Sequence, residues 1–208
     1  MINSNEEFLE KFWDYYLELE REFLEIEKFI PVDSINSTTY SLQYLKLFLS
    51  ICSEFDVVFK DFLSFKNHKG NPENWKIHDY ENFIKNEYPD FCSKEICYNF
   101  KQKIIPFKDW NNGKKLSWWK IYNDCKHHRL DENNGVINYK LANQNNILLS
   151  FSALYQLELY FYCDILKSLH PEEDLIIPTP TSRIFKIINW PYNVSLVKDV
   201  FYVKDNEI

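Results

Sequence analysis

One stretch of the chain, from Trp118 to Arg129, combines side chains that could transfer a proton and bind an anion. Asn123, Lys126 and His127 are three and four residues apart, so on a helix they share one face. Imidazole has an ordinary pKa near 6.5, which suits proton transfer near neutral pH, and Lys and Arg stabilise negative charge on phosphate oxygens. The spacing predicts that an amide, an imidazole and the two cations Lys126 and Arg129 can reach a single anionic ligand.

The same residues also have a structural interpretation. Cations in the last turn of a helix complement its dipole and its free carbonyls, and adjacent aromatic residues such as Trp118 and Trp119 usually anchor a helix in the core. Aromatic rings can also stack on bases, so Trp118 and Tyr122 are predicted as further contacts for RNA or a nucleotide. The basic side chain of Lys120 is predicted as a third such contact.

Other chemistries have weaker support in the sequence. The three glycines, Gly70, Gly113 and Gly135, form neither a Rossmann fingerprint nor a phosphate-binding loop. Cys92 and Cys97 lack the paired spacing of a structural zinc site, and no motif for a nucleophilic enzyme is present. We therefore expect no metal and no cofactor.

The charge is unevenly distributed. The chain has 24 basic and 31 acidic side chains and a net charge of −7, which disfavours broad, non-specific binding of nucleic acid. The segment from Lys114 to Arg129, however, holds five basic residues and one acidic residue, Asp124. This segment could therefore meet a phosphate, or it could pair with the acidic helices.

Several features predict a cytoplasmic protein without a membrane span. The five cysteines are odd in number and lie in apolar segments, which is not typical of a disulfide framework. The first residues lack the basic and apolar pattern of a signal peptide. The most apolar stretch, Ile147 to Leu166, contains Gln156, Glu158 and Asp164, which favours a buried helix.

Apolar periodicity predicts an all-α fold, an antiparallel bundle of four main helices near 4–30, 38–65, 117–130 and 142–169. In the first helix the expected inward residues include Phe8, Phe12, Tyr15, Leu19 and Phe23. Residues 1–170 are predicted to form the bundle domain, with an irregular insertion at about 66–116. Residues 171–208 are predicted to be an extended tail that packs on it.

The segment Tyr122-Asn123-x-x-Lys126-His127-x-Arg129, preceded by Trp118-Trp119, resembles the HEPN superfamily of nucleotide-binding helical proteins. The resemblance implies a helical homodimer with its site completed across the twofold axis. It also implies a metal-independent endoribonuclease of a toxin or phage-defence type, with an antitoxin or defence-system protein as partner. The family's Arg-polar-gap-His motif places Asn123 and His127 at the polar and His positions, and Tyr122 at the position of the Arg.

Two functions are therefore predicted from different classes. The first is an RNA- or nucleotide-binding protein with RNA cleavage as its candidate activity. In this interpretation His127 moves a proton, Lys126 and Arg129 stabilise the phosphate charge, and Asn123 orients the phosphate or the imidazole. The second is a non-catalytic interaction module in which the same residues stabilise the bundle or a dimer interface.

Overall fold

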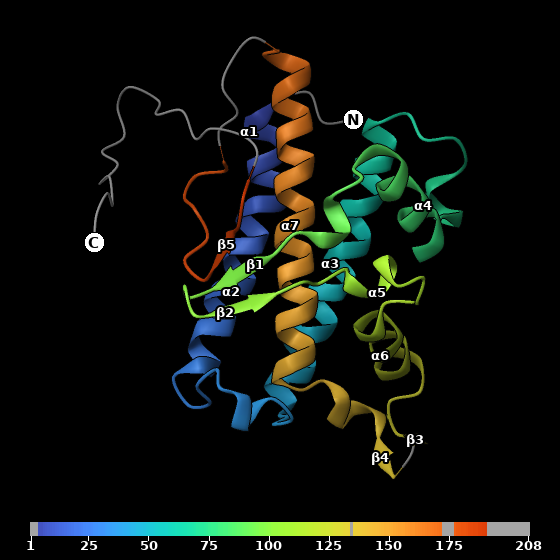
Figure 1. The fold of residues 1–208 in the computed structure, drawn as a ribbon. Helices are drawn as coiled ribbons and strands as arrows, with labels where there is room; N and C mark the ends of the chain where they lie inside the picture. The colour runs from blue at the N-terminus through green and yellow to red at the C-terminus, as the bar shows by residue number, and fades with distance from the viewer. Residues whose placement is uncertain (1–3, 134, 172–176, 191–208) are drawn as a thin grey trace.

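The computed structural model describes residues 4–133, 135–171 and 177–190 and shows a mostly helical chain with a small sheet (Figure 1). The helices are α1 (Asn5–Phe8), α2 (Asp14–Glu27), α3 (Leu42–Phe65), α4 (Ile77–Glu87), α5 (Lys108–Asn111), α6 (Ser117–His127) and α7 (Gln144–Leu169). The strands are β1 (Ile96–Tyr98), β2 (Gln102–Ile104), β3 (Glu132–Asn133), β4 (Val136–Ile137) and β5 (Phe185–Ile187).

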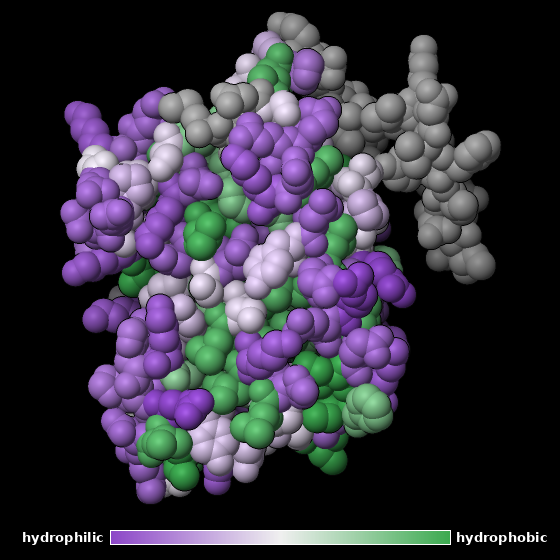
Figure 2. Space-filling view, turned by 180° about the vertical axis from the view of Figure 1, so that it is seen from behind, coloured by the Kyte–Doolittle hydropathy of each residue, from purple (hydrophilic) through white to green (hydrophobic). Residues whose placement is uncertain are grey.

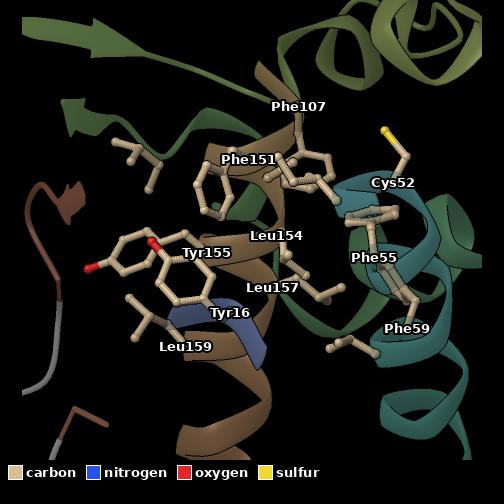
Figure 3. Close-up of a cluster of buried hydrophobic side chains, with 14 of the residues drawn as sticks. Tyr16, Cys52, Phe55, Phe59, Phe107, Phe151, Leu154, Tyr155, Leu157 and Leu159 are labelled. Atoms are coloured by element: carbon tan, nitrogen blue, oxygen red, sulfur yellow. The ribbon is translucent and has the colours of Figure 1, made fainter. Parts of the chain in front are cut away.

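Helix α7 is the centre of the molecule, with α2 on one side and α3 on the other (Figure 1). All its residues from Ser150 to Leu166 are buried, as expected of a helix that is apolar on every side. Aromatic side chains dominate the contacts: Phe62 of α3 stacks on Phe161 with ring centres 4.8 Å apart. Figure 3 shows Phe55 and Phe59 of α3 pointing toward this core.

A π-helical turn, Leu9–Trp13, joins α1 to α2 and changes the buried face of the first helix. The extra residue in this turn rotates the following residues by about 100°. Trp13 and Tyr16 are therefore buried, whereas Tyr15 is 42% exposed. The prediction that Tyr15 faces the core was wrong for this reason, while Phe8, Phe12, Leu19 and Phe23 are buried as expected.

The fold is mostly helical rather than purely helical, because three segments form an antiparallel sheet of order β2-β1-β5. Ile96 of β1 pairs with Ile104 of β2 and with Ile187 of β5. In Figure 1, β1 and β2 cross in front of α7. Strands β3 and β4 form a separate hairpin after α6. The all-α prediction therefore holds for the main architecture, which is mostly helical, with one small sheet and a short hairpin added to it.

The four predicted long helices are present, and two of them start later than predicted. Helix α3 begins at Leu42 because the Ser41 side chain accepts a hydrogen bond from the backbone N–H of Tyr44. Helix α7 begins at Gln144, where Asn143 accepts from the N–H of Asn146. Both starts lie later than predicted, and both follow a polar capping residue.

The segment predicted as an insertion, 66–116, holds α4, β1, β2 and α5. Within the predicted tail, the structure describes residue 171, which follows α7, and residues 177–190, which contain β5. The predictions for 172–176 and 191–208 lie outside the described residues. Among the residues that the structure describes, no helix has the length and apolar composition needed to cross a membrane.

Candidate functional site

Helix α6 carries the predicted site and is fixed at its start by the residues before it. Its first backbone N–H, at Ser117, donates to the carboxylate of Asp109 at 2.9 Å. The Asp109 side chain therefore caps the helix at its first residue. The Trp118 indole donates to the carbonyl of Pro106 at 3.1 Å and contacts the Phe55 ring edge-on.

The inner face of α6 consists of Trp118, Tyr122 and Cys125, all buried. Because the Trp118 and Tyr122 rings lie in the core, neither is presented to a ligand on the surface. Burial raises the pKa of the Cys125 thiol to about 11, and its Sγ donates to the Asn138 carbonyl. A thiol held protonated in this way is a poor nucleophile.

The outer polar residues of α6 are partly engaged within the helix. The Asn123 amide donates through Nδ2 to the Trp119 carbonyl at 2.8 Å, one turn earlier. Lys120 is paired with Asp124 at 2.6 Å. The Lys126 ammonium lies 5.3 Å from the centre of the Tyr122 ring, close enough for a cation–π contact.

The helix ends at His127, earlier than predicted, and this moves Arg129 off the helix. The backbone leaves the helical region at His128 (φ −133°). The His128 carbonyl accepts from the Asn138 side chain at 2.8 Å, and the Arg129 carbonyl accepts from the N–H of Tyr139. The prediction that the helix runs to about 130, which would place Arg129 on it three residues after Lys126, was therefore wrong, although both residues lie within three positions of the helix end.

Asn138 is a positioning residue that sequence reasoning missed. It lies thirteen residues after Cys125 and holds the end of α6 through its amide and its backbone carbonyl. The only signal in the sequence was the turn at Asn133-Asn134-Gly135, which implied that the chain returns toward α6 without indicating which residue touches it.

His127 is exposed at the last position of α6, and cations surround both ends of the helix. Lys114 and Lys115 lie before the start of α6, and Lys126 and Arg129 lie near its end. All four side chains are exposed, and none has a carboxylate within ion-pair distance among the described residues. By contrast, many other lysines are paired, including those at positions 11, 28, 46, 60, 66, 85, 94, 103 and 120.

This arrangement can attract an anion and present an imidazole to it, but it holds no second proton-transfer group in place. The neighbouring imidazole, His128, lies 3.3 Å from the carboxylate of Asp131. Among the described residues, no three His, Cys, Asp or Glu side chains gather as metal ligands would. The chemistry open to this surface is electrostatic binding and proton transfer by His127.

Comparisons with known proteins do not add to this geometry. No protein-family model matches the chain, and no curated protein and no solved structure matches it.

Proposed function

We propose that this chain is a HEPN-like RNA- or nucleotide-binding protein of the cytoplasm, built as an antiparallel helical bundle. The single observation that supports the proposal is the set of unpaired, exposed cations beside an exposed His127, in a chain whose net charge is −7. Unpaired cations on an acidic protein are electrostatically free to contact phosphate. Helix α6 has 11 residues and is therefore about 16 Å long, so a polynucleotide is needed to contact both of its ends at once.

Cleavage would follow the metal-independent route of RNA. The 2′-oxygen attacks the adjacent phosphorus, the bond to the 5′-oxygen breaks, and the 2′-proton is removed while the leaving oxygen gains one. His127 serves one of these two proton transfers, and Lys126 and Arg129 stabilise charge on the phosphate. Because Nδ2 of Asn123 is bonded to Trp119, the amide oxygen of Asn123 is the atom that can orient a ligand or the imidazole.

A second copy of the chain would supply the other proton-transfer group. Apolar side chains are exposed at the end of the molecule where α6 ends, including Phe29 (84% exposed) and Leu130 (73%). The loop after α2 and the segment after α6 meet here through the rings of Tyr40 and Tyr139. Figure 2 shows hydrophobic surface gathered at this lower end. Homodimer formation through this end would cover it and bring the two His127 side chains toward one another.

The experiment measures binding and cleavage separately. Single-stranded RNA is incubated with the full-length protein in chelator, and its ends are analysed for 2′,3′-cyclic phosphate. Replacement His127→Ala is expected to reduce cleavage by about 10²–10⁴-fold. The matched control is His128→Ala, which removes the neighbouring exposed imidazole. Equal effects of the two variants would refute the role of His127.

For binding, the logarithm of the association constant is measured against the logarithm of salt concentration. Each phosphate contact contributes about −0.7 to the slope for single strands, so the double variant Lys126→Gln/Arg129→Gln should make the slope shallower by about 1.4. Lys85→Gln, which removes a paired cation on α4, is the control. An unchanged slope in the double variant would show that these cations do not contact RNA.

A non-catalytic interaction module is the second candidate, and two contacts favour it. The Asn123 amide bonds its own helix, and Tyr122, at the position where the family has Arg, is buried. A protein partner such as an antitoxin or defence-system component would then use the same exposed end. Dimer formation without RNA binding, measured by sedimentation with and without RNA, is the result expected of this candidate.

A further inference from the structure

A cavity of about 320 Å³ lies on the other side of the molecule from α6, between α2, α7, the β1–β2 turn and the segment 177–186. Trp13, Tyr155, Leu159 and Phe185 contribute apolar wall. Figure 3 shows Tyr155 and Leu159 on the side of α7 away from Phe55. The volume falls at the lower end of the range of small-molecule sites.

One wall of the cavity is held in place by a buried carboxylate. Glu20 of α2, only 2% exposed, accepts hydrogen bonds from the Ser182 hydroxyl (2.5 Å) and from the backbone N–H of Arg183 (2.9 Å). The Trp13 indole donates to the Pro180 carbonyl at 2.7 Å. The loop is thereby fixed to α2 before any ligand arrives, which lowers the entropy lost on binding.

The π-helical turn ends at Trp13, the residue that enters this cavity. Without the extra residue in that turn, the side chains of Tyr16 and Glu20 would be rotated by about 100° about the helix axis. Turns of this kind occur frequently at functional sites. The π-helical turn therefore lies beside the cavity and contributes Trp13 to its wall.

The mouth of the cavity carries an exposed aromatic residue in an unfavourable conformation. Phe100 is 80% exposed and has φ +57°, and the preceding Asn99 has φ +45°. A left-handed backbone is unfavourable for a bulky residue, and it directs the ring of Phe100 to the surface beside the cavity. The Lys186 ammonium lies 5.1 Å from the centre of that ring.

The charged side chains that line the mouth, among the residues that the structure describes, are both basic. Arg183 and Lys186 line the cavity, no described lining residue is acidic, and neither cation has a carboxylate at ion-pair distance among the described residues. We propose that this cavity is a binding site for a small planar aromatic carboxylate, with the ring between Trp13, Tyr155 and Phe100 and the carboxylate near Lys186 and Arg183. Aromatic walls favour a flat ring, and the cations select an anion.

Cys97 provides a direct measure of occupancy. It lines the cavity and is partly exposed, whereas Cys52, Cys92, Cys125 and Cys163 are buried. Alkylation of Cys97 in the native full-length chain, followed by peptide mass spectrometry, is measured with indole-3-acetate, with the neutral indole-3-acetamide and with the cation tryptamine. We expect Cys97 to react, and we expect saturable protection in the order carboxylate, amide, amine.

Variants separate recognition from folding. Lys186→Gln should weaken protection by the carboxylate by about two- to fivefold, the usual contribution of an exposed ion pair, and leave protection by the amide unchanged. Lys101→Gln is the matched control, because Lys101 is an exposed cation of the neighbouring β1–β2 turn and does not line the cavity.

Phe100→Gly should have opposite effects on binding and stability. Glycine tolerates the positive φ, so the midpoint of thermal unfolding should rise by about 2–6 °C, while the carboxylate should bind about three- to tenfold more weakly. If Phe100 had a purely structural role, the variant would not combine a higher midpoint of thermal unfolding with weaker binding of the carboxylate.

The proposal is overturned by any of three results: Cys97 is unreactive in the native chain, the three indole compounds protect equally, or Lys186→Gln and Phe100→Gly leave protection unchanged. None of these readouts depends on RNA, so the outcome is independent of the function proposed for α6.

Discussion

The carboxyl group of Glu158 should make the stability of this protein decrease as the pH rises. Glu158 lies in the middle of α7 and is fully buried, and no described donor bonds either of its oxygens. Burial, together with the nearby charge of Glu54, raises its pKa well above the ordinary value of 4.5. Burial and the charge of Asp61 also raise the pKa of Glu54, to about 7.

The direction of this pH dependence follows from the number of protons that the folded and unfolded chains bind. Above pH 4.5 the unfolded chain loses the Glu158 proton, whereas the folded chain keeps it, so the folded state binds more protons and the free energy of unfolding falls as pH rises. One retained proton corresponds to about 1.4 kcal/mol per pH unit. The free energy of unfolding therefore falls by about 1.4 kcal/mol for each pH unit over which the folded Glu158 keeps a proton that the unfolded chain has lost. Glu54 adds a change of the same sign that ends near pH 7.

Glu158→Met should remove the effect, because methionine has similar length and no polar atom. At pH 5 the variant should be more stable than the wild type by about 1–3 kcal/mol, the cost of a buried polar group without a partner. Above pH 5 the difference should grow with pH, by about 1.4 kcal/mol for each pH unit over which the folded wild type keeps the Glu158 proton. Urea unfolding at several pH values measures both quantities, and Glu158→Gln tests whether the pH dependence comes from titration, since glutamine is polar but does not ionise.

A wild-type unfolding free energy that is constant from pH 5 to pH 7, or a Glu158→Met variant that is less stable at both values, would refute this reasoning. Either result would mean that the folded protein already stabilises the ionised carboxylate.

Three further variants test the contacts that position the two sites. Glu20→Gln should lower the free energy of unfolding by about 1.5–3 kcal/mol, the value of hydrogen bonds to a charged group, and should speed proteolysis near Ser182. Asp109→Ala removes the cap of α6 at Ser117 and should lower stability by about 1 kcal/mol, measured by urea unfolding. Phe161→Ala, in the aromatic core, should lower stability by about 3–5 kcal/mol, measured in the same way.

The long helices could be predicted from the sequence because their apolar residues recur with the period of a helix over many turns. The capping residue Ser4 was also predictable, and its hydroxyl accepts from the N–H of Glu7. The π-helical turn could not be predicted, since it changes the spacing by a single residue between two runs that each look regular. Tyr15 and Trp13 are two residues apart, and the turn alone decides which is buried.

Contacts between distant segments explain the other differences. Strand β5 pairs with β1 through Ile96 and Ile187, which are 91 positions apart in the sequence, so no local pattern marked either strand as paired. The bond from Ser182 to Glu20 spans 162 positions, and in the sequence Glu20 is one of many glutamates of a charged helix. Its burial depends on a loop that the periodicity of α2 does not describe.

At the candidate site, the spacing in the sequence predicted which residues are neighbours on α6. It did not predict which of their atoms are available to contact a ligand. Asn123, Lys126 and His127 do lie on α6, as their three- and four-residue intervals require. The amide nitrogen of Asn123 is nevertheless bonded to its own helix, and the chain leaves the helix before Arg129. One imidazole and flexible cations on an open surface can bind an anion weakly, whereas catalysis needs groups fixed in position. If this surface cleaves RNA, the fixed groups must therefore come from the substrate or from a second copy of the chain, and the rate per chain should rise with protein concentration until the dimer is saturated.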